Sequence, residues 1–306
     1  MNIICMGDAL IDFKETDPLT FKGFVGGSPL NVAVAVARLG ESVGFASQIS
    51  TDQFGGAIEA HLQKNGVDTS FLLESDAPST LAFVGEVEGE AVFDFIANRS
   101  ADVLYDPQPR QSFGEVKMVQ FGSISLLQEP AATTLTETAA KHKDDAIIVF
   151  DPNVRPALIS DRDAFEARLR RDWLPISHVV KVSSQDLRWL YPDTPFDEVA
   201  QRWLGHGCEV VILTDGGEGV TLYRQGQDKL SVPSFEVEVV DTVGAGDTFT
   251  GALMVSLLDH GTVQIQDERW REVLRTATAA SAFNCTRAGA NPPTKEELEG
   301  FLLEHA

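Results

Sequence analysis

The feature that most constrains the fold of this chain is a repeated alternation of short apolar runs with longer helix-like segments. Residues 3–6 and 43–49 are short and largely apolar, and helical patterns follow them at 32–39 and 54–65, each ending at a glycine. A short apolar run is typical of a strand buried on both faces, and alternation of such strands with helices predicts a parallel sheet. The alternation returns after residue 117 and gives about eight core strands, which indicates the α/β class. In this later part we predict strands at 118–121, 146–150, 179–182, 209–214 and 235–240, a hairpin at 219–223 and 229–232, and helices at 131–141, 163–173, 185–190, 196–203, 248–258, 268–282 and 295–303.

A strand pair interrupts this alternation. Residues 79–86 and 90–96 have the pattern of two strands joined by a tight turn at 87–89. A hairpin within an α/β chain usually belongs to a separate small sheet, and we expect this one to form a lid. We therefore predict a single domain over residues 1–306, with a lid formed by 11–25 and 79–98.

The charge and composition of the chain exclude several classes of partner. The net charge is −22, from 24 basic and 46 acidic residues, which argues against a nucleic-acid backbone or an anionic membrane as partner. Every apolar run falls short of the roughly 18 residues that a membrane-spanning helix needs. The N-terminal strand also lacks the basic segment of a signal peptide, so we expect a cytoplasmic protein. The three cysteines and six histidines show no spacing that indicates a metal site or a disulfide framework.

One stretch carries both an anion site and a carboxylate. Asp241-Thr-Val-Gly-Ala-Gly-Asp247 joins the predicted strand at 235–240 to the predicted helix at 248–258. The N–H groups of Gly244, Ala245 and Gly246 would turn outward at the positive end of this helix, which makes an anion site. A carboxylate at Asp247 repels an anion. Its position makes sense if it takes a proton from the group that attacks the anion. The stretch therefore predicts an anion hole with a general base.

Polar residues also follow many of the other predicted strands. In open α/β sheets, ligands bind at the carboxyl ends of the strands. A single aspartate after a strand often only caps the next helix, but repetition at many strands indicates a ligand site. The residues concerned are Asp8, Asp12, Asp151, Asn153, Lys181, Thr214, Asp215, Asp241 and Asp247.

The Gly26-Gly27 pair has two interpretations. It is either a loop that leads into a helix, with Ser28 as the N-cap, or a backbone that lets a polyol approach closely. In the second case Asn31 would hydrogen-bond the hydroxyls of the polyol. Asp12 would accept from neighbouring hydroxyls, because an ionised carboxylate only accepts hydrogen bonds.

Arg155, in Asp151-Pro-Asn-Val-Arg-Pro156, also has two interpretations. Its forked and permanent charge suits a phosphate or an acidic substrate, or it belongs to a surface loop stiffened by two prolines. Other nucleotide and hydrolase motifs can be excluded. The sequence has no Gly-x-x-x-x-Gly-Lys-Ser/Thr and no Gly-x-Ser-x-Gly, and Phe249 stands where a dinucleotide fingerprint needs its third glycine.

Two separated signatures resemble those of the PfkB-type (ribokinase-like) carbohydrate kinases. They are Gly26-Gly-Ser-Pro-Leu-Asn-Val-Ala33 near the N-terminus and Asp241-Thr-Val-Gly-Ala-Gly-Asp-Thr-Phe249 near the C-terminus. Their order and spacing and the hairpin also match, so the resemblance covers essentially the whole chain. It implies a three-layer α/β/α domain with a mostly parallel central sheet and a small β-sheet lid. It further implies ATP as phosphoryl donor, Mg²⁺ as required ion, and K⁺ beside the anion hole.

The resemblance also implies roles for single residues. Asp247 resembles the base that deprotonates the sugar, and the N–H groups of Gly244, Ala245 and Gly246 resemble the hole for the γ-phosphoryl group. The residues that match sugar-binding positions, or that we assign to the substrate, are Asp12, Gly27, Asn31, Arg99 and Arg155. Those assigned to the nucleotide are Lys181, Ser183, Thr214, Gly216, Gly219, Asn284 and Gly289.

The metal positions are less uniform. Asp241 and the carbonyl of Val243 match the K⁺ site, together with carbonyls near 287–291. Relatives commonly carry Asn-x-x-Glu for Mg²⁺, whereas this chain has Ser183-Ser-Gln-Asp186, so the carboxylate is shorter and a serine replaces the amide. A carboxylate at Asp186 can still hold a water molecule bound to Mg²⁺.

The identity of the sugar rests on fewer residues. Ribokinases tend to carry lysine where this chain has Ser28, which counts against ribose. The stretch that begins at Asp151 resembles both fructokinases and 2-keto-3-deoxygluconate kinases, while Ser100-Ala-Asp102 and Lys181-Val-Ser183 favour fructose. We therefore predict an ATP-dependent kinase that makes fructose 6-phosphate, possessing a lid that excludes water and pairs two chains into a dimer. The alternatives are a 2-keto-3-deoxygluconate kinase, in which Arg155 or Arg99 faces the substrate carboxylate, and a non-catalytic sugar- or nucleotide-binding protein.

Overall fold

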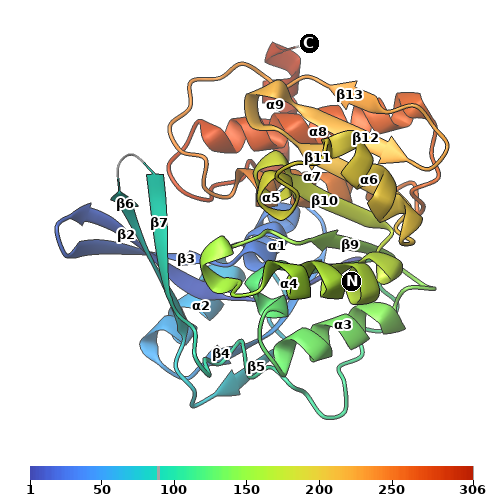
Figure 1. The fold of residues 1–306 in the computed structure, drawn as a ribbon. Coiled ribbons are helices and arrows are strands. Elements are labelled where there is room, and N and C mark those ends of the chain that lie inside the picture. Colours follow the sequence, from blue (N-terminus) through green and yellow to red (C-terminus); the bar gives the residue numbers. More distant parts are fainter. Residues whose placement is uncertain (88–89, 306) are drawn as a thin grey trace.

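The main sheet has nine strands and is mostly parallel. The computed structural model describes residues 1–87 and 90–305, and Figure 1 shows how the elements are arranged. The strand order is β13-β12-β11-β10-β9-β8-β1-β4-β5, and the seven strands from β11 to β5 pair in parallel. Only β12 and β13 at one edge pair antiparallel, as the predicted hairpin. The strands are β1 Ile3–Met6, β4 Val43–Ser50, β5 Leu72–Ser75, β8 Met118–Gly122, β9 Ile147–Asp151, β10 Val179–Ser183, β11 Val210–Thr214, β12 Val220–Arg224 and β13 Leu230–Val232.

Helices cover both faces of this sheet, because successive side chains of the buried strands point to opposite faces. In β1, Ile3 and Cys5 belong to one core cluster, whereas Ile4 and Met6 belong to the other. The first cluster contains residues of α1 Ser28–Arg38, α2 Gln53–Lys64, α7 Ala245–Leu258, α8 Asp267–Cys285 and α9 Lys295–Glu304. The second contains residues of α3 Ala131–Lys141, α4 Arg162–Arg168, α5 Ser184–Leu190 and α6 Phe196–Gly205. The predicted three-layer α/β/α architecture is therefore confirmed.

The lid is a separate four-stranded sheet in the order β3-β2-β6-β7, and it stands out to one side of the main sheet (Figure 1). Its strands are β2 Leu10–Asp17, β3 Thr20–Gly26, β6 Thr80–Val87 and β7 Glu90–Ile96. Phe13 stacks on Phe83 with ring centroids 5.2 Å apart and meets Phe54 of α2 edge-on at 5.8 Å, so aromatic contacts join the lid to the main body. The turn predicted at 87–89 includes residues 88 and 89, which lie outside the described residues.

Residues 235–240 are not a strand, which corrects the sequence-based prediction. Within the described chain this segment joins neither sheet. Apolar and acidic residues do alternate here, but only Phe235 and Val237 pack on the core, whereas Val239 and Val240 are exposed. Phe235 lies 5.5 Å from Phe301 of α9, measured between ring centroids. The N–H of Val240 donates to the carbonyl of Cys285 at the end of α8 (2.8 Å). The segment is therefore an extended connection that delivers the chain to the start of α7.

Two further differences concern element boundaries. The N-cap of α1 is Gly27, with φ 115°, and not Ser28, so the Ser28 side chain makes no cap hydrogen bond and is available for another contact. The short edge strand β5 raises the number of core strands to nine, because its half-exposed residues give no continuous apolar run. No helix in the described part of the chain has the length and hydropathy that a membrane crossing requires.

Candidate active site

A cavity of about 1940 Å³ lies between the lid, the carboxyl ends of the main-sheet strands and the first turns of α1 and α7. Of the predicted site residues, those that line it are Asp12, Gly27, Asn31, Arg155, Lys181, Ser183, Asp186, Thr214, Gly216, Gly219, Asp241, Val243, Gly244, Ala245, Gly246, Asp247 and Gly289. Among the residues predicted for the sugar, the nucleotide and the ions, Arg99 and Asn284 lie off this lining, and of the polar residues predicted after strands so do Asp151 and Asp215. Arg99 is exposed beyond the end of β7, and Asn284 is fully buried within α8.

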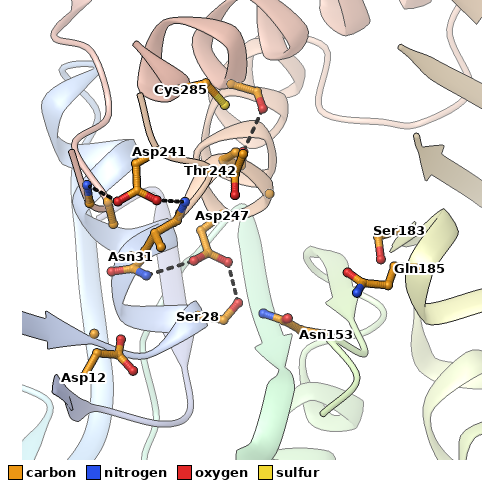
Figure 2. Close-up of a pocket in the computed structure, with 18 of the residues that line it drawn as sticks. Asp12, Ser28, Asn31, Asn153, Ser183, Gln185, Asp241, Thr242, Asp247 and Cys285 are labelled. Carbon is orange, nitrogen blue, oxygen red and sulfur yellow. Dashed lines mark hydrogen bonds between the residues drawn. The ribbon is translucent and has the colours of Figure 1, made fainter. Parts of the chain in front are cut away.

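Asp247 lies in the first turn of α7 and is held by two donors from the start of α1. Its Oδ1 accepts a hydrogen bond from Oγ of Ser28 at 2.7 Å, and its Oδ2 accepts one from Nδ2 of Asn31 at 2.9 Å. Figure 2 shows Asp247 between these two side chains. Burial raises the pKa of Asp247, although the two hydrogen bonds and the nearby Lys181 ammonium group oppose the rise. A buried carboxylate of raised pKa that lines a cavity has the properties of a general base.

The loop before Asp247 needs its first glycine for space. Gly244 is the N-cap of α7 with φ 73°, and a Cβ there would lie 2.5 Å from Cβ of Ala290. The first N–H groups of a helix have no partner within the helix and attract anions. The Ala245 N–H already donates to the carbonyl of Thr242 at 3.2 Å, so one of the three predicted N–H groups is engaged in the turn.

Lys181, in the middle of β10, places a buried positive charge at this helix start. Its Nζ donates to Oδ2 of Asp151 at 2.9 Å, and the two side chains are 6% and 1% exposed. A Cβ on Gly246 would lie 2.8 Å from the same Nζ, so the ammonium group lies against the backbone of the predicted anion hole. Burial lowers the pKa of Lys181, but attraction to Asp151, Asp247 and Asp186 outweighs this effect and raises it. The side chain therefore stays charged and strengthens the anion site.

Asp186 and Ser183 form the capping box of α5. The Asp186 N–H donates to Oγ of Ser183 at 3.0 Å, and the Ser183 N–H donates to Oδ2 of Asp186 at 3.4 Å. Burial, followed by repulsion from Asp151, raises the pKa of Asp186. In the described part of the chain, no group of three or more His, Cys, Asp or Glu residues is placed to hold a metal ion. Mg²⁺ typically uses one or two carboxylates and takes other ligands from substrate phosphates and water, so the single carboxylate of Asp186 fits an ion carried by a nucleotide.

Asp241 orders the loop that precedes α7. Its carboxylate accepts the N–H groups of Val243 at 3.1 Å and Gly289 at 3.0 Å, and Nζ of Lys14 from the lid lies 3.5 Å away. Burial raises the pKa of Asp241, but these donors outweigh it and lower the pKa below its ordinary value. The carbonyl of Val243 accepts Nδ2 of Asn284 at 2.8 Å, so Asn284 supports this loop from beneath. An ionised carboxylate beside ordered carbonyls suits a monovalent cation.

The Gly26-Gly27 pair allows close contacts within the protein. A Cβ on Gly26 would lie 2.1 Å from Oδ2 of Asp12, and a Cβ on Gly27 would lie 2.4 Å from the carbonyl of Asp8. The pair therefore lets the start of α1 approach both the lid strand β2 and the end of β1. Burial raises the pKa of Asp12 to about 6, with attraction to Arg155 opposing the rise.

Sequence reasoning missed part of the site. Ser28 stands three residues before Asn31, and this spacing puts two donors on one face of α1. The spacing is the sequence signal that could have identified Ser28 as a site residue. Gln185, which was not predicted, also lines the cavity. Asn153, predicted as a polar residue after a strand, lines it too and adopts a positive φ of 39° two residues after the end of β9. Figure 2 shows Ser183 and Gln185 across the cavity from Asp241.

Comparison with known proteins bears on this arrangement. The model of the pfkB family of carbohydrate kinases matches residues 1–297. A fructokinase of Rhizobium leguminosarum bv. trifolii is 36% identical over 260 residues, which cover 83% of this chain and 79% of the relative.

Solved structures of sugar kinases are similar to this chain over nearly its whole length. A fructokinase of Xylella fastidiosa with bound ATP superposes with a TM-score of 0.91 at 30% identity, covering 99% of this chain and 98% of the other. An aminoimidazole riboside kinase of Salmonella enterica has a TM-score of 0.88 at 28% identity and covers 99% and 100%. A double mutant of a Vibrio cholerae O395 fructokinase, with fructose, ADP and a potassium ion bound, also has a TM-score of 0.88, at 26% identity with 98% of each chain covered.

Proposed function

Because the chain belongs to the pfkB family of carbohydrate kinases, we propose that it transfers the γ-phosphoryl group of ATP to D-fructose and makes fructose 6-phosphate. One observation carries this proposal: the carboxylate of Asp247 and the ammonium group of Lys181 both lie at the start of α7, in the wall of the same cavity. A base and an anion site side by side are what phosphoryl transfer to a hydroxyl needs. The fructokinase relatives favour fructose among the sugars.

The chemistry follows from this geometry. Asp247 takes the proton of the attacking sugar hydroxyl, and the oxygen electron pair forms the new bond to the γ-phosphorus while the bond to the ADP oxygen breaks. The N–H groups of Gly244 and Gly246, together with Lys181, neutralise the charge on the phosphoryl oxygens, and the Ala245 N–H joins them once it leaves the carbonyl of Thr242. Positioning and charge stabilisation of this kind supply most of the catalysis in phosphoryl transfer.

The nucleotide end of the cavity would hold ATP and its ions. We assign the nucleotide to Lys181 and to a set of small and polar residues that line the cavity, namely Ser183, Thr214, Gly216, Gly219 and Gly289. Asp186 would orient water bound to Mg²⁺, which when present neutralises phosphate charge. Asp241 and the Val243 carbonyl would hold K⁺ beside the loop. For Asn284 we propose support of this loop in place of contact with adenine, because its amide donates to Val243.

The sugar end would lie beneath the lid. Asp12, Gly27, Asn31 and Arg155 line the cavity and would contact the sugar. Arg99 would join them only after movement of the lid, because it is exposed in this structure. Closure would exclude water, which otherwise accepts the phosphoryl group. The single-domain organisation, a dimer through the lid and a cytoplasmic location stay predictions.

A coupled ADP-release assay tests the substrate. It uses ATP, Mg²⁺ and varied K⁺ with fructose, ribose, 2-keto-3-deoxygluconate and aminoimidazole riboside as acceptors. We expect the highest kcat/KM with fructose. Turnover confined to another acceptor would refute the assignment of fructose, and binding of ATP without turnover on any sugar would favour a non-catalytic binding protein.

The Asp247→Ala variant tests the mechanism. We expect kcat to fall by several powers of ten while the dissociation constant for ATP stays nearly unchanged, because the carboxylate acts on the hydroxyl and not on the nucleotide. Unchanged turnover would remove Asp247 from the role of base.

A 2-keto-3-deoxygluconate kinase is the second candidate, and Arg155 is the observation that favours it. The guanidinium group lies close enough to Asp12 and Asp186 to oppose the rise in pKa that burial causes in both carboxyls, so it would also attract a substrate carboxylate. Under this alternative Arg155→Gln should raise the KM for the keto acid by far more than the KM for fructose.

A further inference from the structure

The two hydrogen bonds to Asp247 differ in how firmly their donors are held. The bond from Ser28 is buried, and the Ser28 side chain belongs to a residue only 7% exposed. The bond from Asn31 is only partly buried, and Asn31 is a half-buried residue of the cavity wall. Both residues line the cavity, and the Asn31 amide is the donor that a ligand reaches more easily because its residue is the more exposed of the two.

The backbone on both sides of Ser28 is fixed by the end of β1. The Ser28 N–H donates to Oδ2 of Asp8 at 3.3 Å, and Oδ1 of Asp8 in turn accepts the Ser125 N–H at 3.4 Å. Gly27 lies so close to the Asp8 carbonyl that a Cβ would come within 2.4 Å. On the other side, Pro29 packs so closely on Gly7 that a Cβ there would come within 2.7 Å of the proline ring. The backbone that carries the Ser28 hydroxyl is therefore held in place.

This difference decides which oxygen of Asp247 is available to a substrate. A rotation of the carboxylate about its terminal bond costs little unless donors restrain it, because that torsion is broad. Ser28 supplies a fixed restraint at Oδ1. The Asn31 amide at Oδ2 can be exchanged for a hydroxyl that offers an equivalent hydrogen bond.

We propose that Ser28 is a positioning residue for the base: its hydroxyl fixes Oδ1 of Asp247, and Oδ2 takes the proton of a sugar hydroxyl that has replaced the Asn31 amide. This inference rests on the proposed function. The sugar O–H bond breaks, its proton goes to Oδ2, and its electron pair forms the bond to the γ-phosphorus as the bond to ADP breaks. The displaced Asn31 amide then donates to a neighbouring hydroxyl of the sugar.

The Ser28 hydrogen bond also sets when the base is ionised. A donor to the charged form of a carboxyl lowers its pKa, and loss of that donor raises it. The other charged groups that act on Asp247 are Lys181 on β10, Asp151 on β9 and Asp12 on β2, and none of them changes when Ser28 is replaced. Ser28→Ala should therefore raise the pKa of Asp247 by about one unit, since a hydrogen bond to a charged group contributes about that much.

The test compares Ser28→Ala, Asn31→Ala and the control Ser177→Ala, which deletes a buried hydroxyl that donates to the Trp173 carbonyl away from the cavity. We expect Ser28→Ala to shift the acid limb of the kcat profile to higher pH by about one unit. The loss of kcat should be about tenfold below that limb and should shrink as the pH rises. Asn31→Ala should mainly raise the KM for the sugar, and Ser177→Ala should leave both the limb and the KM unchanged.

A titration of the free protein separates this inference from the proposed function. The ¹³C carboxyl signal of Asp247, assigned by its loss in Asp247→Asn, is followed from pH 3 to 9 in wild type and in Ser28→Ala without any substrate. An upward shift of its midpoint in Ser28→Ala supports the contact, and coincident curves overturn it. A higher KM for the sugar with an unmoved acid limb in Ser28→Ala would also overturn it, because Ser28 would then bind the sugar. Absence of turnover in wild type with every acceptor would refute the proposed function, whereas the titration tests Ser28 in either case.

Discussion

The buried pair of Lys181 and Asp151 makes a quantitative prediction about stability and activity together. Replacement of Lys181 by methionine removes the ammonium group but keeps a side chain of similar length. The carboxylate of Asp151 is 1% exposed and would lose the partner that lies 2.9 Å away. Removal of one member of a buried ion pair costs about 3–5 kcal/mol, because the other charge stays buried without compensation.

This cost converts into a melting temperature. The unfolding entropy of globular proteins is about 2.1 cal/mol/K per residue, so for 306 residues a loss of 3–5 kcal/mol lowers Tm by roughly 5–8 °C. Differential scanning calorimetry measures the shift. A coupled ADP-release assay on the same samples should give at least a hundredfold lower kcat, since Lys181 lies against the proposed anion hole.

The double variant Asp151→Asn with Lys181→Met separates the two effects. Asparagine keeps an oxygen that can accept the Asn153 N–H, which now donates to Oδ1 of Asp151 at 3.0 Å. With both charges removed, we expect most of the loss in Tm to be recovered while kcat stays low. The reasoning is refuted if Lys181→Met melts within 1 °C of wild type, or if the double variant regains activity along with stability.

Three further predictions follow from single contacts. Alanine at Gly246 places a Cβ 2.8 Å from Nζ of Lys181, so the KM for ATP should rise severalfold. Alanine at Gly56, where no atom lies within 4 Å, should leave this KM unchanged. Equal KM values for the two variants would contradict the close contact at Gly246. Burial raises the pKa of Asp12 to about 6, so its contribution to stability is present in full below its unfolded pKa and is lost as the pH rises through 6. The Tm of Asp12→Asn relative to wild type should accordingly increase from pH 4 to pH 8, and a constant difference would argue against the raised pKa. The Lys14 side chain is 58% exposed, so Lys14→Met should barely change Tm. Its ammonium group lies beside the proposed K⁺ site and would compete with the ion, so its loss should lower the K⁺ concentration for half-maximal activity. An unchanged K⁺ dependence would disprove this competition.

The sequence predicts the main sheet well because its strands are buried on both faces. In β1, β8 and β9 every residue is buried, so each strand appears in the sequence as a short apolar run. The lid strand β3 is mostly exposed and carries polar residues, so it gives no such run even though it is fully paired with β2. The pattern at 235–240 predicts a strand because alternation of apolar and acidic residues is typical of one. In the structure Phe235 and Val237 pack on the core, with Phe235 against α9, while Val239 and Val240 are exposed.

In the candidate site, too, the sequence identifies residues that are neighbours along the chain but not contacts between distant residues. Gly244, Gly246 and Asp247 are found together because one loop and one helix start contain them. Asn284 is misplaced by sequence reasoning because its backbone position near the nucleotide side does not reveal that its amide turns down to the Val243 carbonyl. The contact of Ser28 with Asp247 is not visible in either signature alone, because each hydroxyl and carboxylate has an ordinary local explanation as a helix cap.

The distance along the chain between the partners of Asp247 has a consequence for how the protein is made. Ser28 and Asn31 lie 219 and 216 residues before the carboxylate that they hold. Contacts of such sequence separation form late, because the loop they close is costly in entropy and the intervening strands must first assemble. During synthesis, the first turn of α1 leaves the ribosome long before α7 exists, so a nascent or truncated chain with a well-formed sheet still has no oriented carboxylate. Enzymatic activity therefore requires synthesis of the chain through α7, and a refolding experiment should recover secondary structure well before turnover.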